Sequence, residues 1–244
     1  KQIEEMGAHS ICIKDMSGIL LPYNGYELIR EIKNNISIPL ELHTHSTCGI
    51  GEMLYLKAIE AGADIVDTAI STLGGGTSQP PTESMVRTFM GSEYRCDVNY
   101  DVLRDIADYF KPIREKYLKD GILSPKSYFI NPQIIETQLP GGMISNMINQ
   151  MKAQGVEDKF EDVLKEIPKV RKDLGYPPLV TPLSQMVGTQ AVMNILSGEQ
   201  YKMISKEIKD YVKGLYGCPP YEISKELKDK ILKDGEEITC RPAD

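Results

Sequence analysis

The sequence predicts a parallel α/β fold at the start of the chain and a mostly helical region after it. Over residues 1–90, short apolar strands alternate with helical segments at about 30 residues per unit, which is typical of parallel α/β structure. Residues 97–244 instead carry apolar stripes at helical spacing, separated by turns that contain proline and glycine. The two patterns therefore predict two regions of different architecture.

Three predicted strands alternate with three predicted helices in the first region. The expected strands are 10–13, 36–42 and 63–70, and the expected helices are 23–34, 52–61 and 82–90. In parallel α/β folds the functional residues gather at the carboxyl ends of the strands. Lys14, His43 and the glycine-rich loop 74–79 all follow strand ends. We therefore expect three strands to deliver polar residues to one face.

Long apolar stripes predict a helical core in the second region. They run over residues 101–118, 160–170, 186–196 and 201–215. From about residue 225 the chain becomes highly charged, and we expect a linker or a frayed helix there.

The composition is that of an ordinary globular protein, with 244 residues, 41% hydrophobic and 26% charged. The net charge of -7 argues against general nucleic-acid binding. No apolar run reaches the length of a membrane span, and the first residues show no signal-peptide pattern. The five cysteines are widely spaced, which favours free thiols in a reducing cytoplasm over a disulfide framework.

Two of the three histidines, His43 and His45, stand one residue apart at the end of the second predicted strand. Side chains on a strand alternate between faces, so both imidazoles point the same way. Two imidazoles on one face can share a metal ion, since histidine is the commonest metal ligand. The pair alone leaves a second interpretation open, in which both rings are partly buried and only hydrogen-bonded.

Several separate motifs together resemble one enzyme family. They are residues 14–18 (KDMSG), 43–45 (HTH), 76–80 (GTSQP), 138–143 (QLPGGM), 173–182 (DLGYPPLVTP) and 214–217 (GLYG). They resemble the carboxyltransferase domain of biotin-dependent enzymes that act on pyruvate and oxaloacetate. Residues 80–85 (PPTESM) make the chain more similar to the oxaloacetate decarboxylase alpha subunit and to the two-subunit pyruvate carboxylases than to the single-chain pyruvate carboxylases.

The resemblance implies a TIM barrel, (β/α)8, followed by a helical extension. The α/β region corresponds to the last three βα units; the first five are missing, which would leave an open parallel edge. We expect residues 1–95 to be the C-terminal part of the barrel, 96–222 the post-barrel extension and 223–244 a charged tail or linker. We expect the chain alone to be inactive, because the family's aspartate metal ligand and substrate-binding arginine belong to the missing part.

The resemblance also implies a divalent metal, usually zinc and sometimes manganese or cobalt. His43 and His45 match its imidazole ligands, and nitrogen ligands suit zinc. Lys14 matches a lysine that is carboxylated in the family, which turns an ammonium into an anionic carbamate with oxygen ligands. The alternative for Lys14 is an ordinary lysine paired with Asp15. Asp67, near the end of the third predicted strand, is expected to hydrogen-bond to a metal ligand and orient it.

Thr77 matches the family's proton-shuttling threonine. Its hydroxyl would relay a proton between the methyl group of pyruvate and biotin, while the metal stabilises the enolate oxygen. Gly76 lets the backbone turn tightly, and both Gly76 and Gln79 are expected in the substrate and biotin pocket. The plain alternative is a strand-to-helix turn in which Ser78 or Thr82 caps the helix.

The expected function is metal-dependent carboxyl transfer between biotin and pyruvate or oxaloacetate, in either direction. Two alternatives stay open: a carbon–carbon lyase or synthase of the same barrel superfamily acting on an acyl-CoA, and a non-catalytic assembly module. Biotin must arrive on another domain or chain, because the Ala-Met-Lys-Met motif that accepts it is absent from the sequence. The expected partners are a biotin carboxyl carrier domain, a biotin carboxylase or membrane decarboxylase subunits, and further copies of the chain.

Overall fold

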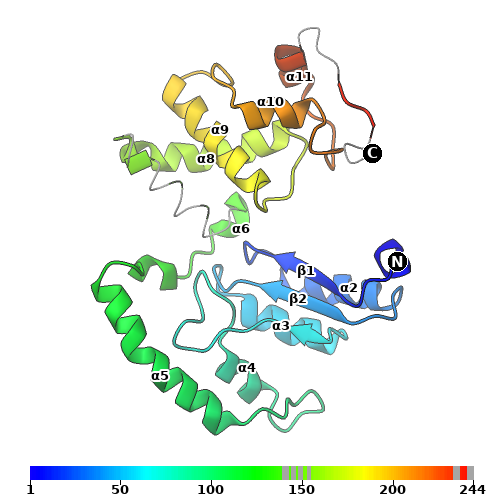
Figure 1. Ribbon diagram of the computed structural model, residues 1–244, viewed down its shortest axis with the longest axis vertical. Helices are drawn as coiled ribbons and strands as arrows, with labels where there is room; N and C mark the ends of the chain where they lie inside the picture. Colours follow the sequence, from blue (N-terminus) through cyan, green and yellow to red (C-terminus); the bar gives the residue numbers. More distant parts are fainter. Residues whose placement is uncertain (139–142, 144–146, 148–150, 153–154, 233–236, 241–244) are drawn as a thin grey trace. The chain divides into compact units, whose positions relative to one another are not determined.

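The structure, a computed structural model, describes residues 1–138, 143, 147, 151–152, 155–232 and 237–240. Its contacts divide the chain into two compact units, Lys1–Glu136 and Thr137–Asp244, which can be followed by colour in Figure 1. Most of the sequence motif at residues 138–143 lies outside the described residues. Each unit is considered by itself below.

A parallel three-stranded sheet of order β1-β2-β3 forms the centre of the first unit (Figure 1). Helices follow each strand, as the sequence predicts for βα units. The elements of this unit are α1 (Gln2–Glu5), β1 (Ile11–Asp15), α2 (Pro22–Lys33), β2 (Leu40–Thr44), α3 (Gly51–Glu60), β3 (Ile65–Val66), α4 (Thr82–Thr88), α5 (Tyr100–Lys119), η1 (Pro125–Tyr128) and α6 (Ile134–Thr137), which ends one residue beyond it.

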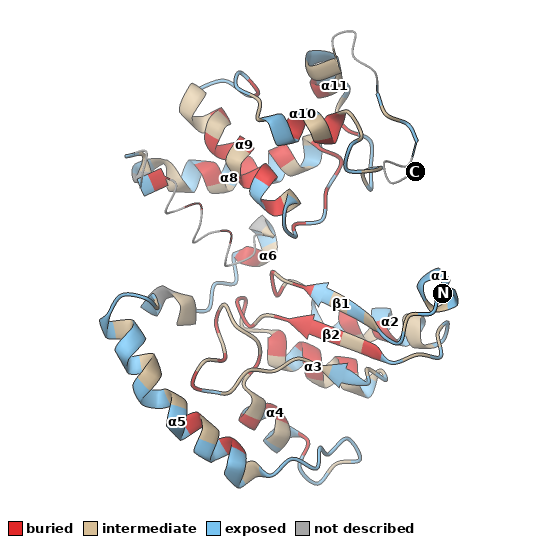
Figure 2. Ribbon diagram, viewed as in Figure 1, coloured by how far each residue is buried: buried red, intermediate tan, exposed pale blue. Residues whose placement is uncertain are grey.

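Strand β2 separates an apolar face of the sheet from a polar one. Leu40 and Leu42 are fully buried in a cluster with residues of α2 and α3, including Ile29 and Leu54. Side chains alternate along a strand, so Glu41 and His43 leave the opposite face. The buried stretch of β2 is visible in Figure 2. The apolar alternation therefore fixes which face carries the histidines.

The observed strands lie later in the chain, or are shorter, than predicted. β1 extends to Asp15, β2 begins only at Leu40, and β3 is reduced to Ile65–Val66 within the predicted range 63–70. After Val66 the registered pairing with β2 ends, and further along Ala69 forms an isolated parallel bridge with Pro81. The apolar composition of 63–70 predicted a strand, but the ladder ends early.

The second unit is a helical cluster, as the apolar stripes predict. It contains η2 (Glu157–Lys159), α8 (Phe160–Asp173), α9 (Leu183–Ser197), α10 (Lys206–Val212) and α11 (Lys225–Leu232). The predicted stripe 201–215 contains only the short helix α10. In the predicted charged tail, α11 is a helix whose Leu227 is buried in the core of this unit. The tail therefore contributes packing surface at this point.

Helix α5 belongs by its contacts to the first unit, together with the sheet. The Thr72 hydroxyl donates a hydrogen bond to the carbonyl of Ala107 in this helix. Along the described residues, no helix is both long enough and apolar enough to cross a membrane. The roles expected for 1–95, 96–222 and 223–244 stay predictions.

Candidate metal centre

The strand register brings the predicted site residues to the polar face of the sheet. Lys14 pairs in register with His43, so the two side chains leave the same face of neighbouring strands. β3 pairs Val66 with Leu42, which puts Asp67, the next residue, beside His43. Asp15 lies on the other face, where its carboxylate accepts a hydrogen bond from the hydroxyl of Thr44. Asp15 and Lys14 therefore leave opposite faces of the sheet, which argues against the alternative in which Lys14 is an ordinary lysine paired with Asp15.

The two histidine rings turn the same nitrogen toward one another. The Nε2 atoms of His43 and His45 lie 3.1 Å apart. Two nitrogens bound to one tetrahedral zinc at about 2.0–2.1 Å would lie about 3.3 Å apart. The spacing of the two rings therefore fits a pair of ligands to a single metal ion.

The other ring nitrogens fix the tautomer of each histidine. His45 Nδ1 lies 2.6 Å from the carbonyl oxygen of Thr77, which can only accept a hydrogen bond. His43 Nδ1 lies 2.6 Å from a carboxylate oxygen of Asp67. Both Nδ1 atoms therefore act as donors, so in the neutral rings both Nε2 atoms are unprotonated and present a lone pair. Two lone pairs facing each other at this distance fit a site for a cation.

The surroundings of His45 and Asp67 lower the pKa of both side chains. Burial lowers the pKa of His45 and, together with the neighbouring His43, outweighs the hydrogen bond to the Thr77 carbonyl, which raises it; the net shift favours the neutral ring that binds metals. Burial works against the charged form of Asp67, but its hydrogen bonds with His43 and Glu41 and the nearby charges of His43 and Lys14 together lower the pKa of that carboxyl. The expectation that Asp67 orients a ligand agrees with this contact.

The glycine-rich loop meets the histidines through its backbone and through Gln79. Gln79 Nε2 lies 3.4 Å from His45 Nε2, which puts this side chain at the edge of the pair. Gly76 has a φ of +54° and packs so tightly that a Cβ atom would lie 2.1 Å from the Ser127 carbonyl oxygen. The Thr77 N–H donates to that same oxygen at 2.8 Å. Thr77 is thus held through both its N–H and its carbonyl, by Ser127 and by His45.

The alternative assignment of the loop as a capped helix start does not match the geometry. α4 begins after Pro81 without a side-chain cap. The Ser78 hydroxyl bonds to the Gln79 side chain, and the Thr82 hydroxyl bonds to Thr68.

Sequence patterns gave no signal for two contacts that hold this site. The Tyr55 hydroxyl donates a hydrogen bond to the Asp67 carbonyl, but Tyr55 lies on a helix among apolar residues, a pattern typical of ordinary core. Ser127 accepts the hydrogen bond from the Thr77 N–H through its backbone carbonyl, which no side-chain motif indicates.

Among the described residues, no three or more histidine, cysteine, aspartate or glutamate side chains converge on one point. Within that part of the chain, the candidate site therefore consists of two imidazoles, with Lys14 in register beside them.

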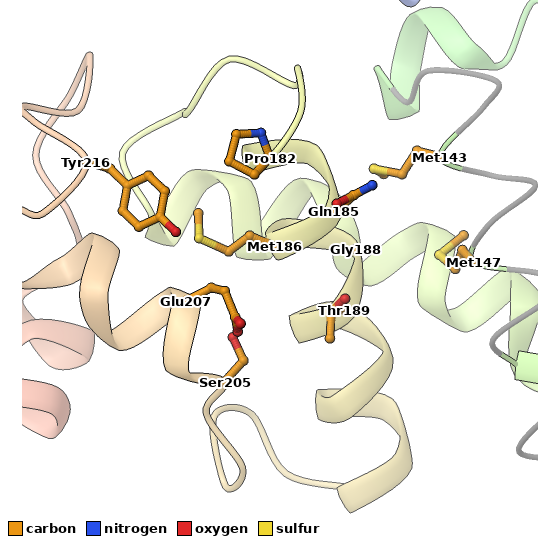
Figure 3. A pocket seen from close by; sticks show the side chains of 10 residues that line it. All are labelled: Met143, Met147, Pro182, Gln185, Met186, Gly188, Thr189, Ser205, Glu207 and Tyr216. Atoms are coloured by element: carbon orange, nitrogen blue, oxygen red, sulfur yellow. The ribbon is translucent and has the colours of Figure 1, made fainter.

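The second unit contains a cavity of about 550 Å³ between α9 and α10. Figure 3 shows the Ser205 and Glu207 side chains close together at one side and Met143 and Met147 at another. Its described lining includes one carboxylate, on Glu207, but no histidine, lysine or cysteine. The described lining of this cavity therefore lacks the pair of imidazole nitrogens that the polar face of the sheet presents.

Two family models and several known proteins are similar to the chain. Residues 1–110 match the family described as HMGL-like, and residues 134–244 match the family described as a conserved carboxylase domain. A pyruvate carboxylase subunit of Methanocaldococcus jannaschii is 56% identical over the whole chain. The chain is therefore similar to the carboxyltransferase part of pyruvate carboxylases. It spans 43% of the length of that relative.

Two further proteins, one compared by sequence and one by structure, are similar to the chain. The methylmalonyl-CoA carboxyltransferase 5S subunit of Propionibacterium freudenreichii subsp. shermanii is 45% identical over the whole chain, which spans 48% of it. The carboxyl transferase domain of Rhizobium etli pyruvate carboxylase, solved with pyruvate, matches 99% of the chain with a TM-score of 0.89 and 29% identity. The match spans 42% of that solved chain.

Proposed function

We propose that the complete protein transfers a carboxyl group between biotin and pyruvate or oxaloacetate. The observation that carries this proposal is the pair of Nε2 atoms of His43 and His45, 3.1 Å apart and oriented by Asp67 and Thr77. The relatives named as pyruvate carboxylase subunits support the substrate class. The carboxylase match over 134–244 favours carboxyl transfer over the lyase alternative.

In this proposal each residue of the site has a distinct role. His43, His45 and a carboxylated Lys14 would hold the metal, with zinc preferred by nitrogen ligands and manganese or cobalt as alternatives. A bound divalent cation would supply the positive charge that stabilises the enolate oxygen of pyruvate. The Thr77 hydroxyl would take a proton from the pyruvate methyl group and pass one to the biotin nitrogen that has lost its carboxyl group. The enolate carbon then forms a bond to the released CO2, which gives oxaloacetate.

The remaining expectations complete the same proposal. Residues 1–95 would supply the last three βα units of a TIM barrel, and the preceding units of the complete protein would close it. Gly76 and Gln79 would line the pocket for substrate and biotin. Biotin would arrive on a carrier domain or another chain, and the complete protein would work in the cytoplasm as a homo-oligomer, with a biotin carboxylase or a membrane decarboxylase subunit as partner.

Metal content and activity of the full-length protein test the proposal. We expect about one divalent metal ion per chain, and its loss in His43→Ala and His45→Ala together with oxaloacetate decarboxylation. His9→Ala is the matched control, because His9 is exposed and lies before β1. A wild type without metal and with unchanged activity in both variants would contradict the proposal. Lys14→Arg keeps the positive charge but cannot form the carbamate, so it is expected to lose metal as well.

A further inference from the structure

The hydroxyl of Tyr55 joins strands β2 and β3 at the point where their ladder opens. Tyr55 is fully buried. Its hydroxyl donates to the carbonyl oxygen of Asp67 at 2.7 Å and accepts from the Thr44 N–H at 3.0 Å. One side chain on α3 therefore bridges backbone groups of two neighbouring strands.

The strands need this bridge because they separate after the last registered pair. That pair is Leu42 and Val66, and the next backbone contact, from the Asp67 N–H to the Leu42 carbonyl, has lengthened to 3.3 Å. A buried N–H or carbonyl left without a partner costs about 1–3 kcal/mol. A hydroxyl both donates and accepts, so that of Tyr55 can stand between the Thr44 N–H and the Asp67 carbonyl and satisfy both groups. Tyr55 thus sets the spacing at which the strands diverge.

The two backbone groups held by Tyr55 flank the candidate metal centre. Thr44 directly follows His43, and Asp67 supplies the carboxylate that lies 2.6 Å from His43 Nδ1. A change in the spacing of these strands would move the carboxylate relative to the imidazole. The spacing therefore controls the hydrogen bond that orients the ring.

We propose that Tyr55 is a positioning residue for the metal centre, and that its hydroxyl acts by holding Asp67 against His43. The inference rests on the proposed function, since it concerns the affinity of that site for its metal. The Tyr55 ring also packs in the core with Ile29 and Leu54. Replacement by phenylalanine removes the hydroxyl and keeps the ring, so the two roles can be separated.

The primary test is the dissociation constant for Co²⁺, measured on the full-length protein by competition with a chelator. We expect Tyr55→Phe to weaken binding about 10-fold, the lower end of what loss of an orienting partner costs a metal site. We also expect it to shift the visible absorption bands of bound Co²⁺, which report ligand geometry. Tyr23→Phe is the control, because Tyr23 is 75% exposed, and should bind as the wild type does. Wild-type affinity and an unchanged spectrum in Tyr55→Phe would overturn the inference.

A double-mutant cycle separates positioning from a general weakening of the fold. If Tyr55 acts through Asp67, combining Tyr55→Phe with Asp67→Asn should weaken binding no more than Asp67→Asn alone. If the two single losses instead multiply, the residues act independently and the inference is wrong.

A conservative replacement covers the case in which Tyr55→Phe does not fold. Replacement of Tyr55 by 4-aminophenylalanine keeps a donor and an acceptor at the same place, and the affinity should stay within about twofold of the wild type. A folded 4-amino variant with weak binding overturns the inference.

The wild type distinguishes the inference from the function on which it rests. A wild type that binds no divalent metal overturns both. A wild type that binds metal and decarboxylates oxaloacetate, together with an unaffected Tyr55→Phe, overturns the inference alone.

Discussion

An alanine at position 76 should displace the loop that carries Thr77. Gly76 has a φ of +54°, and a Cβ there would lie 2.1 Å from the Ser127 carbonyl oxygen and 2.7 Å from the Cα of Tyr128. Both neighbours are backbone atoms, so no side chain can rotate away. The loop would have to move by about 1 Å to restore an ordinary van der Waals separation.

Two costs follow from this displacement. A non-glycine residue in the left-handed region costs about 1–2 kcal/mol. The hydrogen bond from the Thr77 N–H to Ser127 would be lost, at about 1 kcal/mol. In the proton-shuttling role proposed for Thr77, a shift of this size should lower kcat by about 100-fold.

Gly75 provides the matched control for this prediction. Its φ is also positive, at +80°, but nothing lies within 4 Å of its missing Cβ. Gly75→Ala should therefore carry only the conformational cost of about 1–2 kcal/mol and keep the Thr77 contact. The assay is steady-state oxaloacetate decarboxylation by the full-length protein, with hydrogen exchange at the Thr77 amide measured alongside. Equal losses in the two variants, or full activity in Gly76→Ala, would refute the reasoning.

Three further outcomes are expected. Burial works against the charged form of Asp64, but its hydrogen bonds with Leu40 and Lys33 and the Lys33 charge together lower the pKa of its carboxyl, so its stabilising effect is present above the unfolded-state pKa and is lost as the pH falls through the folded-state pKa; urea unfolding should show Asp64→Asn less stable by about 1 kcal/mol at pH 7, with the difference shrinking as the pH falls below about 4. Burial raises the pKa of Cys48 to about 11, so mass spectrometry after iodoacetamide at pH 8 should find Cys48 unmodified while the exposed Cys96 reacts. Asn194→Ala should cost about 2–3 kcal/mol in urea unfolding, because its buried side chain bridges several polar groups in the helical unit.

The Asn194 prediction rests on a buried polar network in the second unit. The Asn194 amide donates to the buried carboxylate of Glu166, and its oxygen accepts from Gln190 and from the Tyr201 N–H. Removal of one member leaves the others without partners inside the core. A loss of less than about 0.5 kcal/mol, within the range of an ordinary surface substitution, would show that the network contributes little.

Local patterns predicted the elements and the histidine pair, because these depend on residues close in sequence. The alternation of side chains along the strand predicted that His43 and His45 leave the same face, and the strand register then determines that Lys14 lies beside His43. The short β3 and the bridge by Tyr55 depend instead on how two strands diverge, which no periodicity records. The contact of Gly76 with Ser127 joins distant segments through backbone atoms, so side-chain chemistry gave no signal for it.

The anchoring of Thr77 to Ser127 has a consequence for how the protein is made. The strands and the glycine-rich loop leave the ribosome first, and the carbonyl that holds the Thr77 N–H follows only after helix α5 has been synthesised. Until then Thr77, whose carbonyl lies against His45, lacks the hydrogen bond at its own N–H. The final position of Thr77 beside His45 is therefore expected only after this later segment, which makes the contact through its backbone, has been synthesised.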